Sequence, residues 1–92
     1  MGWNIELRSD VKIEEKDVEE FVSNLPRQFS SPFGNMRNPW GWSTRVDLVL
    51  QHNVLRMSGA YSISGDIAKE YADYAKEYFE RIGYSTNLIE NW

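Results

Sequence analysis

The sequence contains no cysteine and only one histidine among its 92 residues. Without cysteine there is no disulfide, no thiolate metal site and no thiol nucleophile, which fits a reducing compartment such as the cytoplasm. The histidine, His52, has no second histidine or cysteine with which to form a metal site or a catalytic pair. These absences predict a protein that is not an enzyme and that holds neither a cofactor nor a metal.

Long hydrophobic runs are also missing. No apolar stretch of the sequence approaches the roughly 18 residues of a membrane span. The first ten residues, MGWNIELRSD, lack the basic start and the apolar centre of a signal peptide. The sequence has no Walker loop, no G-x-G-x-x-G run and no G-x-S-x-G nucleophile elbow. We therefore expect a cytoplasmic protein that does not enter a membrane.

Proline is scarce, and its three copies gather in one segment, residues 26–42, as Pro26, Pro32 and Pro39. The same segment carries glycines, asparagines and several large aromatic rings, a composition that excludes a regular helix or a central strand. Its length of about 17 residues exceeds the usual 2–6 residues between a helix and a strand. Such a long connection in a compact domain is typical of a functional loop.

The sequence before this loop has regular periodicity. Residues 3–8, WNIELR, alternate between apolar and polar side chains, which predicts a half-buried strand. Apolar residues then recur at spacings of three and four until Pro26, which predicts an amphipathic helix. The apolar positions of that helix are Val18, Phe21, Val22 and Leu25.

After the loop, residues 44–62 read as a hairpin with His52 and Asn53 as its two-residue turn. Asparagine tolerates the positive φ that such a turn requires, so Asn53 is the expected residue for it. In this register Leu50 faces Leu55 and Leu48 faces Met57, and one face of the hairpin becomes apolar. The other face is polar and carries Arg45, Asp47, Gln51, Arg56 and Ser58.

A second helix is predicted over residues 64–83, with Ser64 as a candidate N-cap and Gly83 as a left-handed C-terminal residue. The acidic residues on its polar side indicate a solvated face, because a straight helix spreads its carboxylates too far apart for a cation site. We interpret its tyrosines as core residues rather than as the lining of a ligand cleft. The apolar stripe comprises Ile67, Tyr71, Tyr74, Ala75, Tyr78, Phe79 and Ile82.

The last residues, 84–92, predict a final strand with Tyr84, Thr86 and Leu88 on one face. The resulting order is β-α-β-β-α-β, which is the ferredoxin-like, split βαβ arrangement of an α+β protein. We expect one domain over residues 1–92, with a four-stranded antiparallel sheet in the order 4-1-3-2 and both helices on one face. The second and fourth strands would be the edges of that sheet.

Charge is unevenly distributed along the chain. Residues 27–63 carry four arginines against one acid, Asp47, whereas acids outnumber bases on both sides of that stretch. The fold is shared with RNA-recognition modules, but the exposed positions of the two central strands carry no aromatic ring for base stacking. Nucleic-acid binding is therefore not expected by that mode. The remaining route would bind a single strand through Arg27, Arg37, Arg45 and Arg56 with Trp40 and Trp42.

The loop itself favours contact with another protein. Tryptophan, phenylalanine, methionine and arginine are the residue types enriched at protein interfaces, and the loop holds all of them. We expect Phe29 and Phe33 to turn inward and Arg37 and Trp40 to turn outward. The predicted contact surface comprises Arg37, Trp40, Trp42 and Arg45.

The sequence thus predicts a small, non-enzymatic binding or regulatory module that contacts a protein partner. By composition it is similar to inhibitors and accessory factors of bacteria and their phages. An exposed edge strand also permits pairing with a second copy of the chain. Two alternatives stay open: a small-ligand or anion-binding domain in which the loop covers a pocket, and single-stranded nucleic-acid binding through the arginines and tryptophans.

Overall fold

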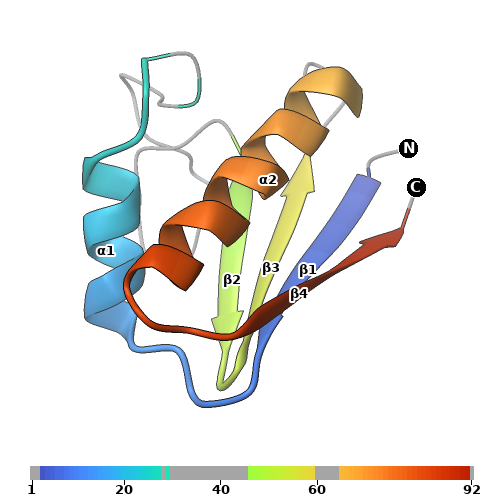
Figure 1. Cartoon of the computed structure of the whole chain (residues 1–92). Helices are drawn as coiled ribbons and strands as arrows, with labels where there is room; N and C mark the ends of the chain where they lie inside the picture. The colour runs from blue at the N-terminus through green and yellow to red at the C-terminus, as the bar shows by residue number, and fades with distance from the viewer. Residues whose placement is uncertain (1–2, 28, 30–45, 60–64, 92) are drawn as a thin grey trace.

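Six elements follow one another in the order expected from the sequence. The computed structural model describes residues 3–27, 29, 46–59 and 65–91. Both helices cover the same face of a single sheet (Figure 1). The elements are β1 (Trp3–Ser9), α1 (Glu15–Ser23), β2 (Asp47–Gln51), β3 (Val54–Gly59), α2 (Gly65–Arg81) and β4 (Thr86–Asn91).

The four strands form one antiparallel sheet in the order β2-β3-β1-β4. This is the predicted order read from the opposite edge, and it confirms the ferredoxin-like α+β fold. Strand β3 lies between β1 and β2, which run parallel to each other, so it splits the first βαβ unit. Strands β2 and β4 are the two edges of the sheet.

The hairpin of β2 and β3 has the predicted register, with Leu48 opposite Met57 and Leu50 opposite Leu55. The expectation for its turn was wrong in one respect, because the positive φ, of 53°, belongs to His52 and not to Asn53. Asn53 is instead tied to the end of β1. Its side-chain amide donates to the Ser9 carbonyl at 3.0 Å, and its own carbonyl accepts from the Ser9 N–H at 2.8 Å.

The core lies between the helices and the inner face of the sheet. Apolar residues alternate inward along the strands, and the inward residues of β1, β2 and β3 are buried, except that Leu50 near the end of β2 is half-buried. Phe21 of α1 lies among four aromatic rings of α2, with ring centres 5.3–5.9 Å apart. Those four rings belong to Tyr71, Tyr74, Tyr78 and Phe79.

One core contact depends on the absence of a side chain. Gly59 of β3 lies opposite Trp3 of β1, whose side chain is 8% exposed. A Cβ atom at Gly59 would come within 2.5 Å of the Trp3 ring, closer than van der Waals contact permits. Glycine at this position therefore leaves the space that the indole ring occupies.

Helix α2 packs on the sheet largely through small residues. Ala68, Ala72 and Ala75 are buried together with Tyr71 and Phe79, and the alanines allow the helix to approach the strands closely. Ile82 was expected on this buried stripe, but it is 44% exposed. The expectation was wrong although the Ile82 N–H still donates to the Tyr78 carbonyl at 3.3 Å, because Ile82 lies one turn beyond the half-buried Tyr78, where the buried stripe has ended.

The C-terminus of α2 has the hydrogen bonds of a Schellman motif. Gly83 has a φ of 117°, its N–H donates to the Glu80 carbonyl at 3.2 Å, and the Tyr84 N–H donates to the Phe79 carbonyl at 3.0 Å. This confirms Gly83 as the predicted left-handed residue. The predicted N-cap, Ser64, lies outside the described residues.

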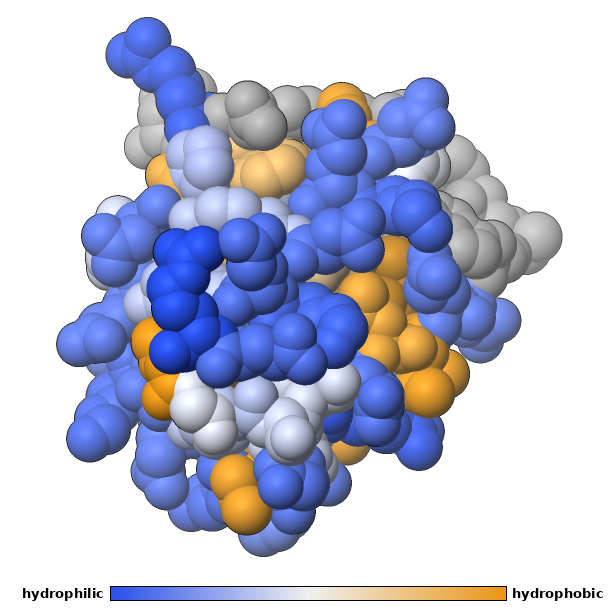
Figure 2. Space-filling view, viewed as in Figure 1, coloured by the Kyte–Doolittle hydropathy of each residue, from blue (hydrophilic) through white to orange (hydrophobic). Residues whose placement is uncertain are grey.

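The outward side of α2 forms a largely hydrophilic surface (Figure 2). Its charged side chains are exposed and form ion pairs along the helix, such as Arg81 with Glu77 at 2.9 Å. Within the described ranges, neither helix has the length and hydrophobicity needed to cross a membrane.

Candidate functional site

The four residues of the predicted contact surface, Arg37, Trp40, Trp42 and Arg45, lie outside the described residues. The structure does place the residues that flank the segment 30–45 in the chain. Phe29, shortly after α1, is 4% exposed, and Val46, directly before β2, is 1% exposed. Both residues that flank the segment are therefore part of the core.

Phe29 packs against the side of α2. Its ring centre lies 5.2 Å from that of Tyr71 in an edge-to-face arrangement and 5.8 Å from that of Tyr74. The expectation that Phe29 turns inward is therefore confirmed. Phe33, which was expected to do the same, lies outside the described residues.

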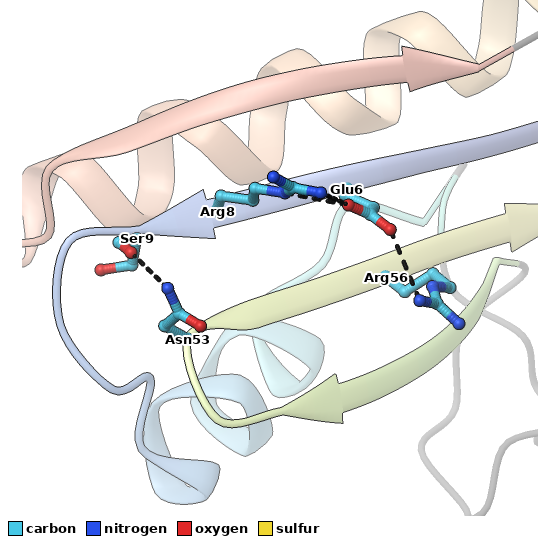
Figure 3. Close-up of polar contacts among 5 residues, drawn as sticks. All are labelled: Glu6, Arg8, Ser9, Asn53 and Arg56. Carbon is cyan, nitrogen blue, oxygen red and sulfur yellow. Dashed lines mark hydrogen bonds and ion pairs between the residues drawn. The ribbon is translucent and has the colours of Figure 1, made fainter.

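The face of the sheet turned away from the helices, which we call the open face, is polar at its centre. The Glu6 carboxylate of β1 accepts from Arg8 at 2.7 Å and from Arg56 of the neighbouring β3 at 3.4 Å (Figure 3). The hydrogen bond from Arg8 is the main cause that lowers the pKa of Glu6 from 4.5, and the charge of Arg56 adds to it. Glu6 thus holds both arginines in ion pairs.

This arrangement bears on nucleic-acid binding. The described open-face positions of β1 and β3 carry no aromatic ring on which a base could stack. A phosphate group that approached Arg8 or Arg56 would also have to compete with Glu6. The open face therefore offers little support for binding through the central strands.

His52 lies in the exposed turn between β2 and β3, as expected. Among the residues that the structure describes, no three histidine, aspartate or glutamate side chains come together as a metal site would require. The acids of α2 are spread along its exposed face, and two of them are occupied by ion pairs with Lys76 and Arg81.

The tyrosines of α2 belong to the core, as expected. Tyr71 is fully buried, and Tyr74 and Tyr78 are half-buried against Phe21. Burial is the main cause that raises the pKa of Tyr78. A surface recess of about 60 Å³ beside these rings is lined by Tyr74, Glu77, Tyr78 and Arg81. This volume is far below the roughly 300–1,000 Å³ of typical small-molecule sites.

One polar link was not visible in the sequence. The Tyr84 hydroxyl accepts from the Glu14 N–H at 3.1 Å and donates to the Asp17 carboxylate at 2.5 Å, so it joins the start of α1 to the turn between α2 and β4. Burial first, and then the bond to Asp17, raise the pKa of Tyr84. Only the tertiary fold brings these residues together, because they are far apart in the chain.

The edge formed by β4 was predicted, but its exposed apolar residue, Ile89, was not singled out. Of the large apolar side chains exposed in the described ranges, only Ile89, at 45%, lies on a strand. At the start of the same edge, Lys76 of α2 donates to the Thr86 carbonyl at 3.0 Å and to Glu80 at 2.7 Å. The sequence did contain a signal for this residue. Ile89 is apolar, yet it falls on the outer face of a strand that was predicted to be an edge of the sheet.

The fold and the sites described above define a class: an α+β protein of ferredoxin-like, split βαβ architecture. Comparison of this chain with protein-family models, with curated proteins and with solved structures found no match. Because this fold hosts many unrelated functions, the architecture alone assigns none.

Proposed function

We propose that this protein is a non-enzymatic binding or regulatory module that acts by contacting another protein. The proposed contact surface comprises Arg37, Trp40, Trp42 and Arg45. The observation that carries the proposal is the pair of buried residues Phe29 and Val46, which tie both ends of the segment 30–45 to the core. A segment tied down at both ends loses less conformational entropy when it binds.

The residue types within the segment indicate the chemistry of the partner. Trp40 and Trp42 offer large apolar surfaces, and Arg37 and Arg45 offer charge-assisted donors for carboxylates. The segments before and after it carry an excess of acids. A partner surface with an apolar pocket beside acidic side chains would be complementary to this combination.

The described part of the chain offers weaker support for the alternatives. The recess on α2 is small, and Arg8 and Arg56 on the open face are paired with Glu6. Protein contact through the loop therefore accounts for more of the observations than a small-ligand site or a nucleic-acid surface does.

A pull-down with the purified chain as bait tests the proposal. The double variant Arg37→Ala/Trp40→Ala is compared with the wild type, and circular dichroism and thermal melting confirm that each bait is folded. The matched control is Arg81→Ala/Ile82→Ala, which also removes one arginine and one large apolar side chain, both of them exposed.

We expect the R37A/W40A bait to recover at least about tenfold less partner, because removing an interface hot spot costs 2 kcal/mol or more. The R81A/I82A bait should recover as much as the wild type. Equal recovery by all three baits would contradict the proposed surface.

A further inference from the structure

We propose that β4 is a self-association edge, through which a second copy of the chain pairs antiparallel about Ile89. This inference concerns a different surface from the loop and does not rest on the proposed loop contact. It starts from the position of β4, which pairs with β1 alone among the described residues and forms one edge of the sheet (Figure 1).

The hydrogen-bond alternation shows which backbone groups of β4 face outward. The Asp10 N–H donates to the carbonyl of Ser85, which lies directly opposite in the register that continues into β4. Directly opposed residues alternate between bonded and non-bonded pairs in an antiparallel sheet. Asn87, Ile89 and Asn91 therefore direct their N–H and C=O groups toward β1. Thr86, Leu88 and Glu90 direct theirs away from the sheet.

The first of these outward residues is already occupied. The Lys76 ammonium donates to the Thr86 carbonyl at 3.0 Å, and Lys76 also lowers the pKa of Glu80 beside it. For Leu88 and Glu90, no hydrogen bond of the outward backbone groups occurs within the described residues. An edge with unpaired backbone groups is a template for another strand.

Of the two-fold registers centred on Leu88, Ile89 or Glu90, one suits this edge. An axis through Ile89 places Leu88 opposite Glu90 of the copy, so that these residues exchange the outward N–H···O bonds. On the open face it brings the exposed Ile89 against Ile89 of the copy, flanked by Asn87 opposite Asn91. The contact buries apolar surface, and no like charges lie directly opposite each other.

The neighbouring registers are less favourable. An axis through Leu88 would need the Thr86 carbonyl, which Lys76 occupies. An axis through Glu90 would place two carboxylates directly opposite each other, which is destabilising. At the other edge of the sheet, strand β2, the central residue is Val49. Its side chain is half-buried, so it offers less exposed apolar surface than Ile89 does. Because the register through Ile89 is self-complementary, the partner that fits the β4 edge is a second copy.

Sedimentation analysis of the full chain from roughly 10 μM to 1 mM tests the proposal, because a small interface is expected to be weak. The wild type should shift from monomer to dimer over this range. The variant Ile89→Lys places two positive charges at the centre of the dimer. In the monomer the same lysine would lie opposite Glu6, so the fold should tolerate it.

The matched control is Ile82→Lys, the same change at a side chain of similar exposure, 44% against 45%, outside the strand. I82K should dimerise like the wild type, whereas I89K should weaken the dimer about tenfold or more. An equimolar mixture of I89K and I89E should associate again, because opposite charges then meet at the axis. Since the I89E carboxylate lies opposite Glu6 in the monomer, circular dichroism and thermal melting first confirm that this variant is folded.

Three results would overturn the proposal. The first is a wild type that stays monomeric up to about 1 mM, at the weak end of specific association. The second is an I89K variant that dimerises as strongly as I82K. The third is a mixture of I89K and I89E that does not associate, which would exclude the register through Ile89. Since no other protein is present, these results are independent of the pull-down on the loop.

Discussion

At the scale of single residues, Glu6 is the most instructive polar side chain. It lies in the middle of the open face, its side chain is only 20% exposed, and it forms ion pairs with Arg8 and Arg56 (Figure 3). Because the pairs favour the ionised carboxylate, the pKa of Glu6 in the folded protein lies below 4.5. A carboxylate with a lowered pKa stabilises the fold above its unfolded pKa, and this contribution is lost as the pH falls through its folded pKa.

The variant Glu6→Gln should therefore lose stability in a pH-dependent way. At pH 7 we expect its free energy of unfolding to be lower than that of the wild type by about 0.5–1 kcal/mol, the range of partly exposed ion pairs. Below the folded pKa of Glu6 the two proteins should become equally stable, because the wild-type carboxyl is then neutral as well. Urea unfolding at pH 7 and at the lowest pH at which the wild type is still folded measures both differences.

A difference between E6Q and wild type that is the same at both pH values would contradict the role of the ionised carboxylate. Added salt is a second check, because screening weakens the ion pairs of exposed arginines. In 1 M salt the difference at pH 7 should shrink.

At the scale of elements, the C-terminal turn of α2 depends on Gly83. Its φ of 117° is unfavourable for residues with a Cβ atom, yet a Cβ atom at this position would meet nothing within 4 Å. A loss of stability in Gly83→Ala would therefore report backbone strain and not crowding. We expect a decrease of about 1–2 kcal/mol in the free energy of unfolding, measured by urea denaturation.

The matched control is Ser85→Ala, an exposed residue two positions later that has no positive φ. This substitution should change stability by less than about 0.5 kcal/mol, as surface substitutions usually do. If G83A were as stable as S85A, the Schellman motif would not depend on glycine.

The elements also show how far the sequence alone could lead. Periodicity predicted both helices and the register of the hairpin, because these depend on repeated burial of one face, and the order of the elements along the chain then predicted the strand order. It placed Ile82 on the buried stripe incorrectly, although Gly83 correctly marked the end of the helix, because an apolar period does not show how far burial extends toward that end. The positive φ of the hairpin turn was expected at Asn53 because of its residue type. In the structure the Asn53 side chain instead donates to the Ser9 carbonyl, a tertiary hydrogen bond that no local pattern reveals.

The candidate sites were less predictable for the same physical reason. The segment 26–42 is rich in proline and glycine and has no period from which inward and outward side chains could be read. Phe29 could be assigned inward only by its size, and the structure confirms this through its contacts with Tyr71 and Tyr74. The sequence predicted β4 as an edge open to a second copy, but the register about Ile89 depends on which backbone groups of β4 face outward, and only the hydrogen bonds of the sheet show this.

At the scale of the whole molecule, stability rests on one small core. A domain of 92 residues is expected to have a free energy of unfolding of about 5–14 kcal/mol. Phe21 joins α1 to α2 because its fully buried ring contacts four aromatic rings of α2. Few other side chains of α1 reach the core, so this ring carries much of the attachment of the helix.

Phe21→Ala should therefore remove a large share of the total stability. Phenylalanine-to-alanine substitutions in a core cost about 3–5 kcal/mol, and in a domain of this size that lowers the melting temperature by roughly 12 °C or more. Thermal unfolding followed by far-UV circular dichroism measures the shift. Val11→Ala, at a side chain that is 55% exposed, serves as the control and should shift the melting temperature by only a few degrees at most. If F21A melted within a few degrees of V11A, α1 would be held by contacts other than the ring cluster, and the single-core account of this fold would be wrong.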